Sequence, residues 1–198
     1  MTEAADSLAE RIGQKLRSVD DFPAPGVRFL DIGPVIADAA LLGAIVDALA
    51  APFEGAGVTH VLGVEARGLY FAGAIATRLG AGLVPARKPG KLPGPVLQAH
   101  GAILDQAGVA GTAGLEPGQI NTYRKPYEFE IAKGVVAPGA RVLVVDDLLA
   151  KGGSLNACRK LVEEAGATLL GAAFMIELGA LGGRDNAAGL AVHAIAVL

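Results

Sequence analysis

The stretch VLVVDDLLAKGGSLNAC, residues 142–158, decides the fold. It opens with four apolar, mostly β-branched residues, 142–145, which predict a strand covered on both faces, as in a parallel sheet. Asp146 and Asp147 follow directly, at the carboxyl end of the predicted strand. Ligands of open α/β sheets bind at this end of the strands. The stretch therefore predicts both the sheet and the place of a functional site.

The next residues, AKGGS at 150–154, predict a tight glycine-bearing turn that leads into a helix over about 154–165. The backbone N–H groups of such a turn converge on a phosphate, and the helix dipole favours the negative charge. The two carboxylates before the turn can accept hydrogen bonds from vicinal hydroxyls or lie near a metal ion. A phosphate site beside a site for vicinal hydroxyls fits a sugar phosphate as the ligand. Taken alone, the same residues also fit an ordinary turn, capped by an aspartate and permitted by the glycines.

Strands and helices alternate on both sides of this stretch, which is typical of βαβ units. The pattern predicts helices at 8–16, 38–51 and 68–79, and strands at 60–64, 82–87 and 169–176. We therefore expect an α/β fold with a central, mostly parallel, twisted sheet flanked by helices.

Between the two halves, residues 90–121 are rich in glycine, proline and alanine. A segment of this length predicts a lid, a binding loop or a disordered segment. Tyr127, Phe129 and Ile131 then alternate with Glu128 and Glu130, which predicts a half-exposed strand.

Composition limits the class of protein. With 198 residues, 52% of them hydrophobic, and no repeat, we expect one globular domain over 1–198. A formal net charge of −3 does not suggest a nucleic-acid surface. The single cysteine, Cys158, excludes an intrachain disulfide and fits a reducing compartment. The acidic start MTEAADSLAE differs from a secretory signal, and Asp47 and Glu177 interrupt the most apolar stretches. We expect a cytoplasmic protein with no membrane partner.

The span 142–154 resembles the phosphoribosyl pyrophosphate motif of the type I phosphoribosyltransferases. Other stretches narrow the resemblance to the adenine phosphoribosyltransferases and follow in that family's order. They are DFPAPGVRFLDIGPV from Asp21, VEARGLYFAG from Val64, ARKPGKLPG from Ala86 and IELGALGGRD from Ile176. The resemblance implies the type I phosphoribosyltransferase fold, with an N-terminal hood region and a long flexible lid loop at 90–121.

The resemblance also implies a role for individual residues. Asp146 and Asp147 would hold the ribose hydroxyls. Three cations would face pyrophosphate, and arginine suits this role because it donates bidentate hydrogen bonds. They are Arg67, Arg87 and Lys91. Mg²⁺ is expected through pyrophosphate and water, with no direct protein ligand. The residues expected around the 5-phosphate are Ala150, Lys151, Gly152, Gly153 and Ser154.

On the base side, Phe29 and Leu148 correspond to the apolar pair that sandwiches adenine in the family. Backbone groups around Arg28 and Leu30 would read the edge of the base. A flat heterocycle between apolar side chains fits a mostly apolar pocket.

The chain departs from the family at three places. Lys151 stands where the phosphate turn usually has threonine, and it either adds a charge to the phosphate or points to solvent. Leu30 replaces the usual arginine, and Arg28 replaces a small apolar residue. In the extended loop, Thr122 and Tyr123 stand where many members have a Glu-Tyr pair thought to assist proton transfer. Tyr123 is thus a candidate catalytic residue, and Glu116 is a nearby alternative for the acid-base role.

These features leave three functions to compare. The first is a salvage enzyme that converts adenine and phosphoribosyl pyrophosphate to AMP and pyrophosphate. The second is a specialised relative with a different sugar-phosphate donor or purine analogue, for example in nucleoside antibiotic biosynthesis. The third is a regulator that binds phosphoribosyl pyrophosphate without turning it over, although DNA-binding regulators carry an additional helical domain and a basic face. We favour the salvage enzyme, as a homodimer.

Overall fold

The computed structural model describes residues 7–26, 28–101 and 127–198. Among these residues, a first compact unit ends at Ile45 and a second begins at Val46. The first unit contains α1 (Leu8–Lys15), the antiparallel strands β1 (Arg17–Val19) and β2 (Phe29–Asp31), and α2 (Gly33–Ile36). The helix α3 (Ala39–Ala50) crosses the boundary.

The predicted N-terminal helix is confirmed, and its start is fixed by a reciprocal pair of hydrogen bonds. The Glu10 N–H donates to the Ser7 hydroxyl at 3.3 Å, while the Ser7 N–H donates to the Glu10 carboxylate at 2.7 Å. This capping box satisfies two N–H groups that have no partner inside the helix.

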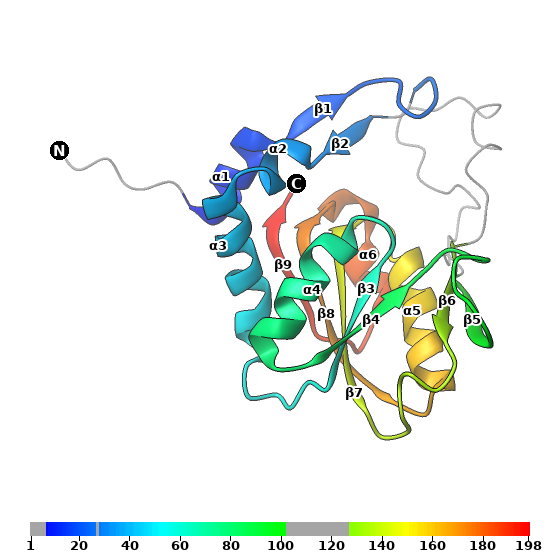
Figure 1. The fold of residues 1–198 in the computed structure, drawn as a ribbon. Coiled ribbons are helices and arrows are strands. Elements are labelled where there is room, and N and C mark those ends of the chain that lie inside the picture. The colour runs from blue at the N-terminus through cyan, green and yellow to red at the C-terminus, as the bar shows by residue number, and fades with distance from the viewer. Residues whose placement is uncertain (1–6, 27, 102–126) are drawn as a thin grey trace. The chain divides into compact units, whose positions relative to one another are not determined.

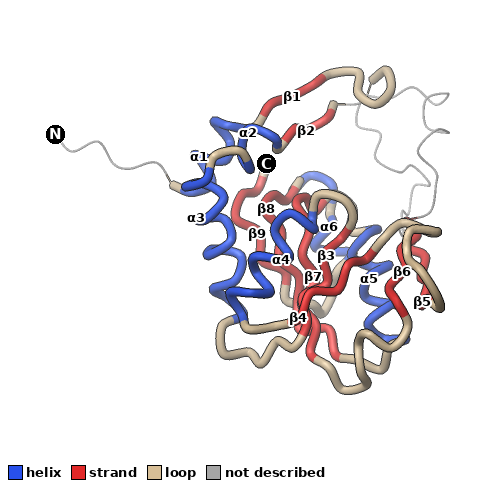
Figure 2. Tube along the Cα trace, viewed as in Figure 1, coloured by secondary structure: helices blue, strands red, loops and turns tan. Residues whose placement is uncertain are grey.

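The second unit is built on a five-stranded sheet of order β4-β3-β7-β8-β9, in which all neighbours are parallel (Figure 2). The strands are β3 (His60–Val64), β4 (Gly82–Ala86), β7 (Arg141–Leu149), β8 (Thr168–Glu177) and β9 (Val192–Val197). Residues 142–145 lie in the central strand, and all four are fully buried. Their continuous apolar character follows from this position, because a central parallel strand is covered on both faces.

Two crossover connections leave the middle of this sheet in opposite directions. The helix α4 (Gly68–Leu79) carries the chain from β3 outward to β4, and α5 (Gly153–Glu164) carries it from β7 to β8. Because such crossovers are right-handed, the two helices cover opposite faces of the sheet (Figure 1). The direction changes between β3 and β7, and this is where ligands of open α/β sheets bind.

The strand β7 is longer than the sequence predicts. Its ladder with β8 continues through Asp146, Leu148 and Leu149, so the aspartates lie within the last part of the strand instead of after it.

A separate antiparallel pair, β5 (Val96–Gly101) and β6 (Tyr127–Ala132), packs beside α5. The predicted alternation of β6 is wrong in detail. Glu130 is buried because its carboxylate accepts a hydrogen bond from the Gly90 N–H at 3.0 Å, whereas Tyr127 is 41% exposed. The remaining short elements are the 3₁₀ helices η1 (Ala51–Phe53) and η3 (Gly179–Leu181) and the helix α6 (Gly183–Asn186).

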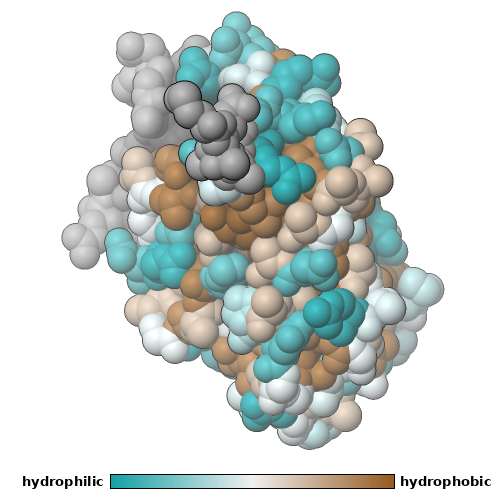
Figure 3. All heavy atoms as spheres, turned by 90° about the vertical axis from the view of Figure 1, so that its left-hand side faces the viewer, coloured by the Kyte–Doolittle hydropathy of each residue, from teal (hydrophilic) through white to brown (hydrophobic). Residues whose placement is uncertain are grey.

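Hydrophobic and hydrophilic residues are interspersed on the face drawn in Figure 3. None of the helices in the described part of the chain combines the length and apolar character needed to span a membrane. The α/β fold with a central parallel sheet flanked by helices, predicted from the sequence, is confirmed.

Candidate active site

The pair Asp146 and Asp147 lies on β7 at the switch point of the sheet. The Asp147 N–H donates a hydrogen bond to Oδ1 of Asp146 at 2.9 Å, and the Asp147 side chain is 5% exposed. Burial and the neighbouring charge of Asp147 raise the pKa of Asp146 well above its ordinary value. The fold therefore holds two carboxylates together against their mutual repulsion.

Arg67 reaches this pair from the turn between β3 and α4. Its Nε lies 3.0 Å from Oδ2 of Asp147. Burial raises the pKa of Asp147, and the charge of Arg67 opposes that rise. The turn lies close to β7 because Gly68 has no side chain: a Cβ there would be 2.5 Å from the Val145 carbonyl oxygen.

The glycine turn after β7 leads into the first turn of α5. Gly152 has a φ of +82°, a conformation that glycine adopts without strain, and it is the N-cap of the helix. The amide of Asn186 donates a hydrogen bond to the Lys151 carbonyl oxygen at 2.9 Å, which ties the turn to α6. The N–H groups at the start of α5 are thus presented at a fixed place, where they suit an anion.

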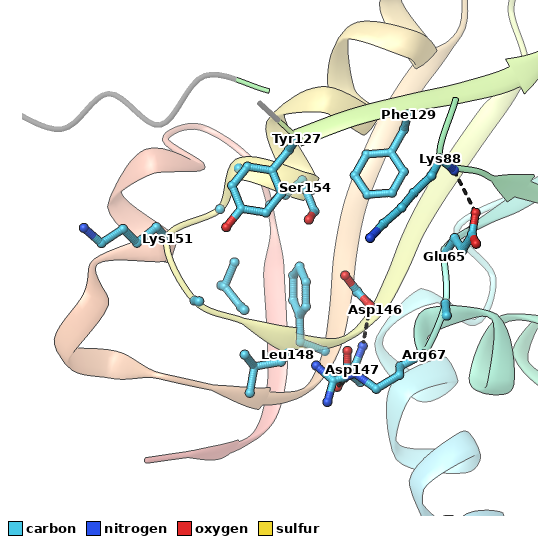
Figure 4. Close-up of a pocket in the computed structure, with 17 residues that line it drawn as sticks. Glu65, Arg67, Lys88, Tyr127, Phe129, Asp146, Asp147, Leu148, Lys151 and Ser154 are labelled. Atoms are coloured by element: carbon cyan, nitrogen blue, oxygen red, sulfur yellow. Dashed lines mark hydrogen bonds and ion pairs between the residues drawn. The ribbon is translucent and has the colours of Figure 1, made fainter. Parts of the chain in front are cut away.

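These elements line one pocket of about 280 Å³ (Figure 4). Asp146, Asp147 and Arg67 lie on one side of it and Ser154 on another, while the Lys151 side chain extends away from the aspartates. A cluster of three or more His, Cys, Asp or Glu side chains able to hold a metal ion is not found in residues 7–26, 28–101 and 127–198. The pocket joins an acidic pair, an arginine and an anion-binding turn.

Glu65 also lines the pocket, and its carboxylate is surrounded by hydrogen-bond donors. Its carboxylate accepts hydrogen bonds from Arg87 Nε at 3.0 Å, Lys91 Nζ at 2.6 Å and the Lys88 N–H at 2.7 Å. Burial of Glu65 opposes its ionisation, but these donors outweigh it and lower the pKa of Glu65 to about 2. Two flexible cations from the segment after β4 are thereby held at one place.

Comparison with known proteins gives the family. A model of the phosphoribosyl transferase domain matches residues 36–192. This chain belongs to the phosphoribosyltransferase family.

Relatives of this phosphoribosyltransferase share most of its length. It is 46% identical to an adenine phosphoribosyltransferase of Sorangium cellulosum, over 85% of this chain and 75% of that protein. A crystal structure of adenine phosphoribosyltransferase from Rhodothermus marinus has 38% identity and a TM-score of 0.81, covering 96% of this chain and 98% of the other. The Saccharomyces cerevisiae enzyme, solved with an imino-altritol bisphosphate and adenine, has 32% identity and a TM-score of 0.77, covering 95% and 98%. The predictions of the family and of a transferase are confirmed.

Many of the site residues predicted for this phosphoribosyltransferase lie together. Those that line the pocket are Arg67, Asp146, Asp147, Leu148, Ala150, Lys151, Gly152, Gly153 and Ser154. Arg87 and Lys91 lie next to it, on Glu65.

Other predicted residues belong to other parts of the chain. Tyr123, Thr122 and Glu116 fall outside the described residues, as does the lid segment from residue 102 onward. Arg28, Phe29 and Leu30 belong to the first unit, in or next to β2. There, Arg28 Nε lies 2.9 Å from Asp20, and the Phe29 ring packs edge-on against Phe22 with centroids 5.1 Å apart. Their part in binding the base stays a prediction.

The sequence did not single out four further groups at the site: Glu65, Lys88, Tyr127 and Asn186. Glu65, Lys88 and Asn186 lie within or next to the stretches that carry the family resemblance, which is the one signal that points to them. Tyr127 was recognised only as part of a strand.

Replacing Glu65 by Gln should lower the free energy of unfolding at pH 7 by roughly 1–3 kcal/mol, because the partly exposed Arg87 and Lys91 lose their common anion. The lowered pKa makes this stabilisation fully present above the ordinary glutamate value of 4.5, and it disappears as the pH falls toward about 2. Denaturant titrations at several pH values should therefore show the wild-type and Glu65→Gln curves converging between about pH 4.5 and 2.

Glu54→Gln is the matched control, since Glu54 pairs with Arg78 but its side chain is 48% exposed. This variant should change stability by less than about 1 kcal/mol. A stability difference between wild type and Glu65→Gln that stays constant with pH would show that Glu65 does not bind its cations through its charge.

Proposed function

We propose that this protein is an adenine phosphoribosyltransferase, which joins adenine to phosphoribosyl pyrophosphate and releases pyrophosphate. The observation that carries the proposal is the single pocket in which the Asp146–Asp147 pair, Arg67 and the 150–154 turn meet. The names of the relatives, and adenine in the yeast structure, support the choice of base.

The proposed role of each site residue follows from its charge. The carboxylates of Asp146 and Asp147 accept hydrogen bonds from the two ribose hydroxyls of the donor, and the N–H groups and Ser154 of the turn hold its 5-phosphate. Arg67, Arg87 and Lys91 stabilise the negative charge that develops on pyrophosphate as its bond to the anomeric carbon breaks. A ring nitrogen of adenine forms the new bond to that carbon and gives up its proton to water or to an acid-base residue.

A magnesium ion fits this arrangement, because carboxylate and phosphate oxygens are the ligands it prefers. When bound, it neutralises charge on the pyrophosphate. Asp146 and Asp147 are the residues nearest to the proposed diol, and they would face the ion across the donor's own oxygens or water.

The cations assigned to pyrophosphate are each paired with a carboxylate. Arg67 is on Asp147, while Arg87 and Lys91 are on Glu65. These ion pairs hold the side chains in place, so they do not have to be ordered when the donor binds. Because less free energy is lost in ordering these side chains, more of the binding energy can stabilise the transition state.

The proposal is tested with purified protein, Mg²⁺ and phosphoribosyl pyrophosphate in the presence of adenine, guanine or hypoxanthine, with mass spectrometry of the nucleotide formed. We expect AMP and little product from the other bases. Absence of AMP, together with product from another sugar-phosphate pyrophosphate, would support the specialised relative instead. Absence of product with every donor, while phosphoribosyl pyrophosphate still binds in calorimetry, would support the regulator.

Lys151 is the residue at which a different donor would be recognised, because it stands in the phosphate turn. Its side chain is partly buried and extends away from the aspartates (Figure 4), and we propose that its charge acts on the 5-phosphate without a direct contact. Lys151→Thr should therefore raise the KM for phosphoribosyl pyrophosphate only about two- to fivefold, with kcat and the KM for adenine unchanged. Steady-state kinetics at low and high salt check this, since salt screens a charge that acts over a distance. A rise of 50-fold or more would mean that Lys151 binds the phosphate directly.

We also propose that the protein is cytoplasmic and forms a homodimer, as the family resemblance implies. Light scattering of the purified protein measures its mass in solution, and the 19.9 kDa of the chain makes monomer and dimer easy to separate.

A further inference from the structure

The strand pair β5–β6 ends directly against the phosphate turn. Gly101 of β5 and Tyr127 of β6 are partners in the ladder. A Cβ on Gly101 would lie 2.0 Å from the Gly153 carbonyl oxygen, and a Cβ on Gly153 would lie 2.4 Å and 2.5 Å from two carbons of the Tyr127 ring. The start of α5 thus packs closely against both strands of the pair, on the Gly101 backbone and on the Tyr127 ring.

This contact places the tyrosine hydroxyl at the pocket. Tyr127 lines it, and in Figure 4 the hydroxyl lies on the side of the turn between Lys151 and Ser154. Within the part of the chain that is described, no other residue forms a hydrogen bond with it. Burial raises the pKa of Tyr127 above its ordinary value, so the group keeps its proton at neutral pH and is available as a hydrogen-bond donor.

We propose that Tyr127 is a further donor-binding residue, whose hydroxyl donates a hydrogen bond to the 5-phosphate held by the 150–154 turn. The turn offers N–H groups from the α5 side only, and the hydroxyl approaches from the β6 side, so the two together enclose the phosphate. The inference rests on the proposed function, because that function supplies the sugar phosphate.

Glycine at 153 is required by this arrangement. Any side chain there would occupy the position of the Tyr127 ring. The ring therefore contributes twice, by packing on the turn and by carrying the hydroxyl.

The test uses Tyr127→Phe, which keeps the ring and its packing on Gly153 and removes only the hydroxyl. A hydrogen bond to a charged group at a partly exposed site corresponds to about a 10-fold loss of affinity. We expect the Kd for ribose 5-phosphate in calorimetry and the KM for phosphoribosyl pyrophosphate each to rise by about this factor, while the KM for adenine stays the same. Tyr70→Phe is the matched control, since Tyr70 is 54% exposed on α4 and lies outside the residues that line the pocket; it should change none of these constants.

The outcomes separate the inference from the proposed function. Unchanged constants for ribose 5-phosphate and the donor would overturn the role of Tyr127, as would tighter binding by Tyr127→Phe, which would mean that the hydroxyl obstructs the site. An equal rise in the KM for adenine would also overturn it. If the wild-type protein made no AMP, the proposed function would fail, but weaker binding of ribose 5-phosphate by Tyr127→Phe would still support the hydroxyl as a phosphate ligand.

Discussion

Asp146→Asn should lower kcat/KM for phosphoribosyl pyrophosphate by about 10- to 100-fold, because a charged acceptor for a ribose hydroxyl is replaced by a neutral amide. Each hydrogen bond to a charged group contributes roughly 1.5–3 kcal/mol, and a factor of ten corresponds to about 1.4 kcal/mol. The same change at Asp147 should have an effect at least as large, since it also removes the partner of Arg67. Near wild-type turnover in both variants would eliminate the proposed ribose site.

The stability of the two variants should differ although their activity falls alike. Asp146→Asn removes one of two adjacent carboxylates, so it should not lower the free energy of unfolding and is expected to raise it. Asp147→Asn removes a buried carboxylate but also the partner of Arg67, so the two effects oppose each other and its free energy of unfolding should lie below that of Asp146→Asn. Denaturant titrations of both variants separate a loss of function from a loss of fold.

The pH dependence of the stability of Asp146→Asn follows from the raised pKa of Asp146 in the wild type. A carboxyl whose pKa is higher in the folded protein binds its proton more tightly there, so the wild type loses stability as the pH rises past the ordinary aspartate value of 3.8. Asparagine at this position does not titrate. The stability advantage of Asp146→Asn should therefore be present at pH 7, shrink as the pH falls toward 3.8 and be absent below that value.

Asp47→Asn is the control for these measurements. Asp47 also pairs with an arginine, Arg78, at 3.3 Å, but its side chain is 68% exposed. The same chemical change should therefore leave kcat/KM unaltered and shift stability by less than about 1 kcal/mol. A loss of activity in this variant would show that the effect at Asp146 is not local to the pocket.

The central part of the site could be predicted because its signals are local. The apolar run at 142–145, the acidic pair and the glycine turn are consecutive in the chain, and each has a physical meaning without knowledge of the fold. The extension of β7 to Leu149 could not be predicted in this way, because it depends on pairing with Ile176 and Glu177 of β8. Strand ends set by a distant partner leave no signal in the strand itself.

Glu65 and Tyr127 were missed for a related reason. A glutamate after a strand is by default a solvated charge, and only the approach of Arg87 and Lys91, more than twenty residues later, gives Glu65 its role. Tyr127 alternates with polar residues, and this pattern predicts only a half-exposed strand. The structure instead turns its ring onto Gly153, which follows on the chain only after β7. Contacts between segments that are far apart in the sequence therefore determine the roles of both residues.

Gly68→Ala should destabilise the protein by roughly 1–3 kcal/mol and lower kcat/KM by about 100-fold, because a single methyl group would separate the Arg67 turn from β7. The new Cβ would lie 2.5 Å from the Val145 carbonyl oxygen and 2.9 Å from the Cα of Asp146. Both are backbone atoms of a central strand, so the turn must move instead, and it carries Arg67 away from Asp147.

Gly73→Ala is the matched control in the same helix, since its Cβ would meet one atom only, a Leu83 methyl at 3.9 Å. Alanine favours a helix interior over glycine by about 1 kcal/mol, so this variant should be as stable as the wild type or more stable, with unchanged kinetics. Opposite signs of the two stability changes would show that the space at Gly68, and not helix propensity, decides the result. If Gly68→Ala kept wild-type kinetics, the close approach of the turn to β7 would not be what aligns arginine and aspartate in the pocket.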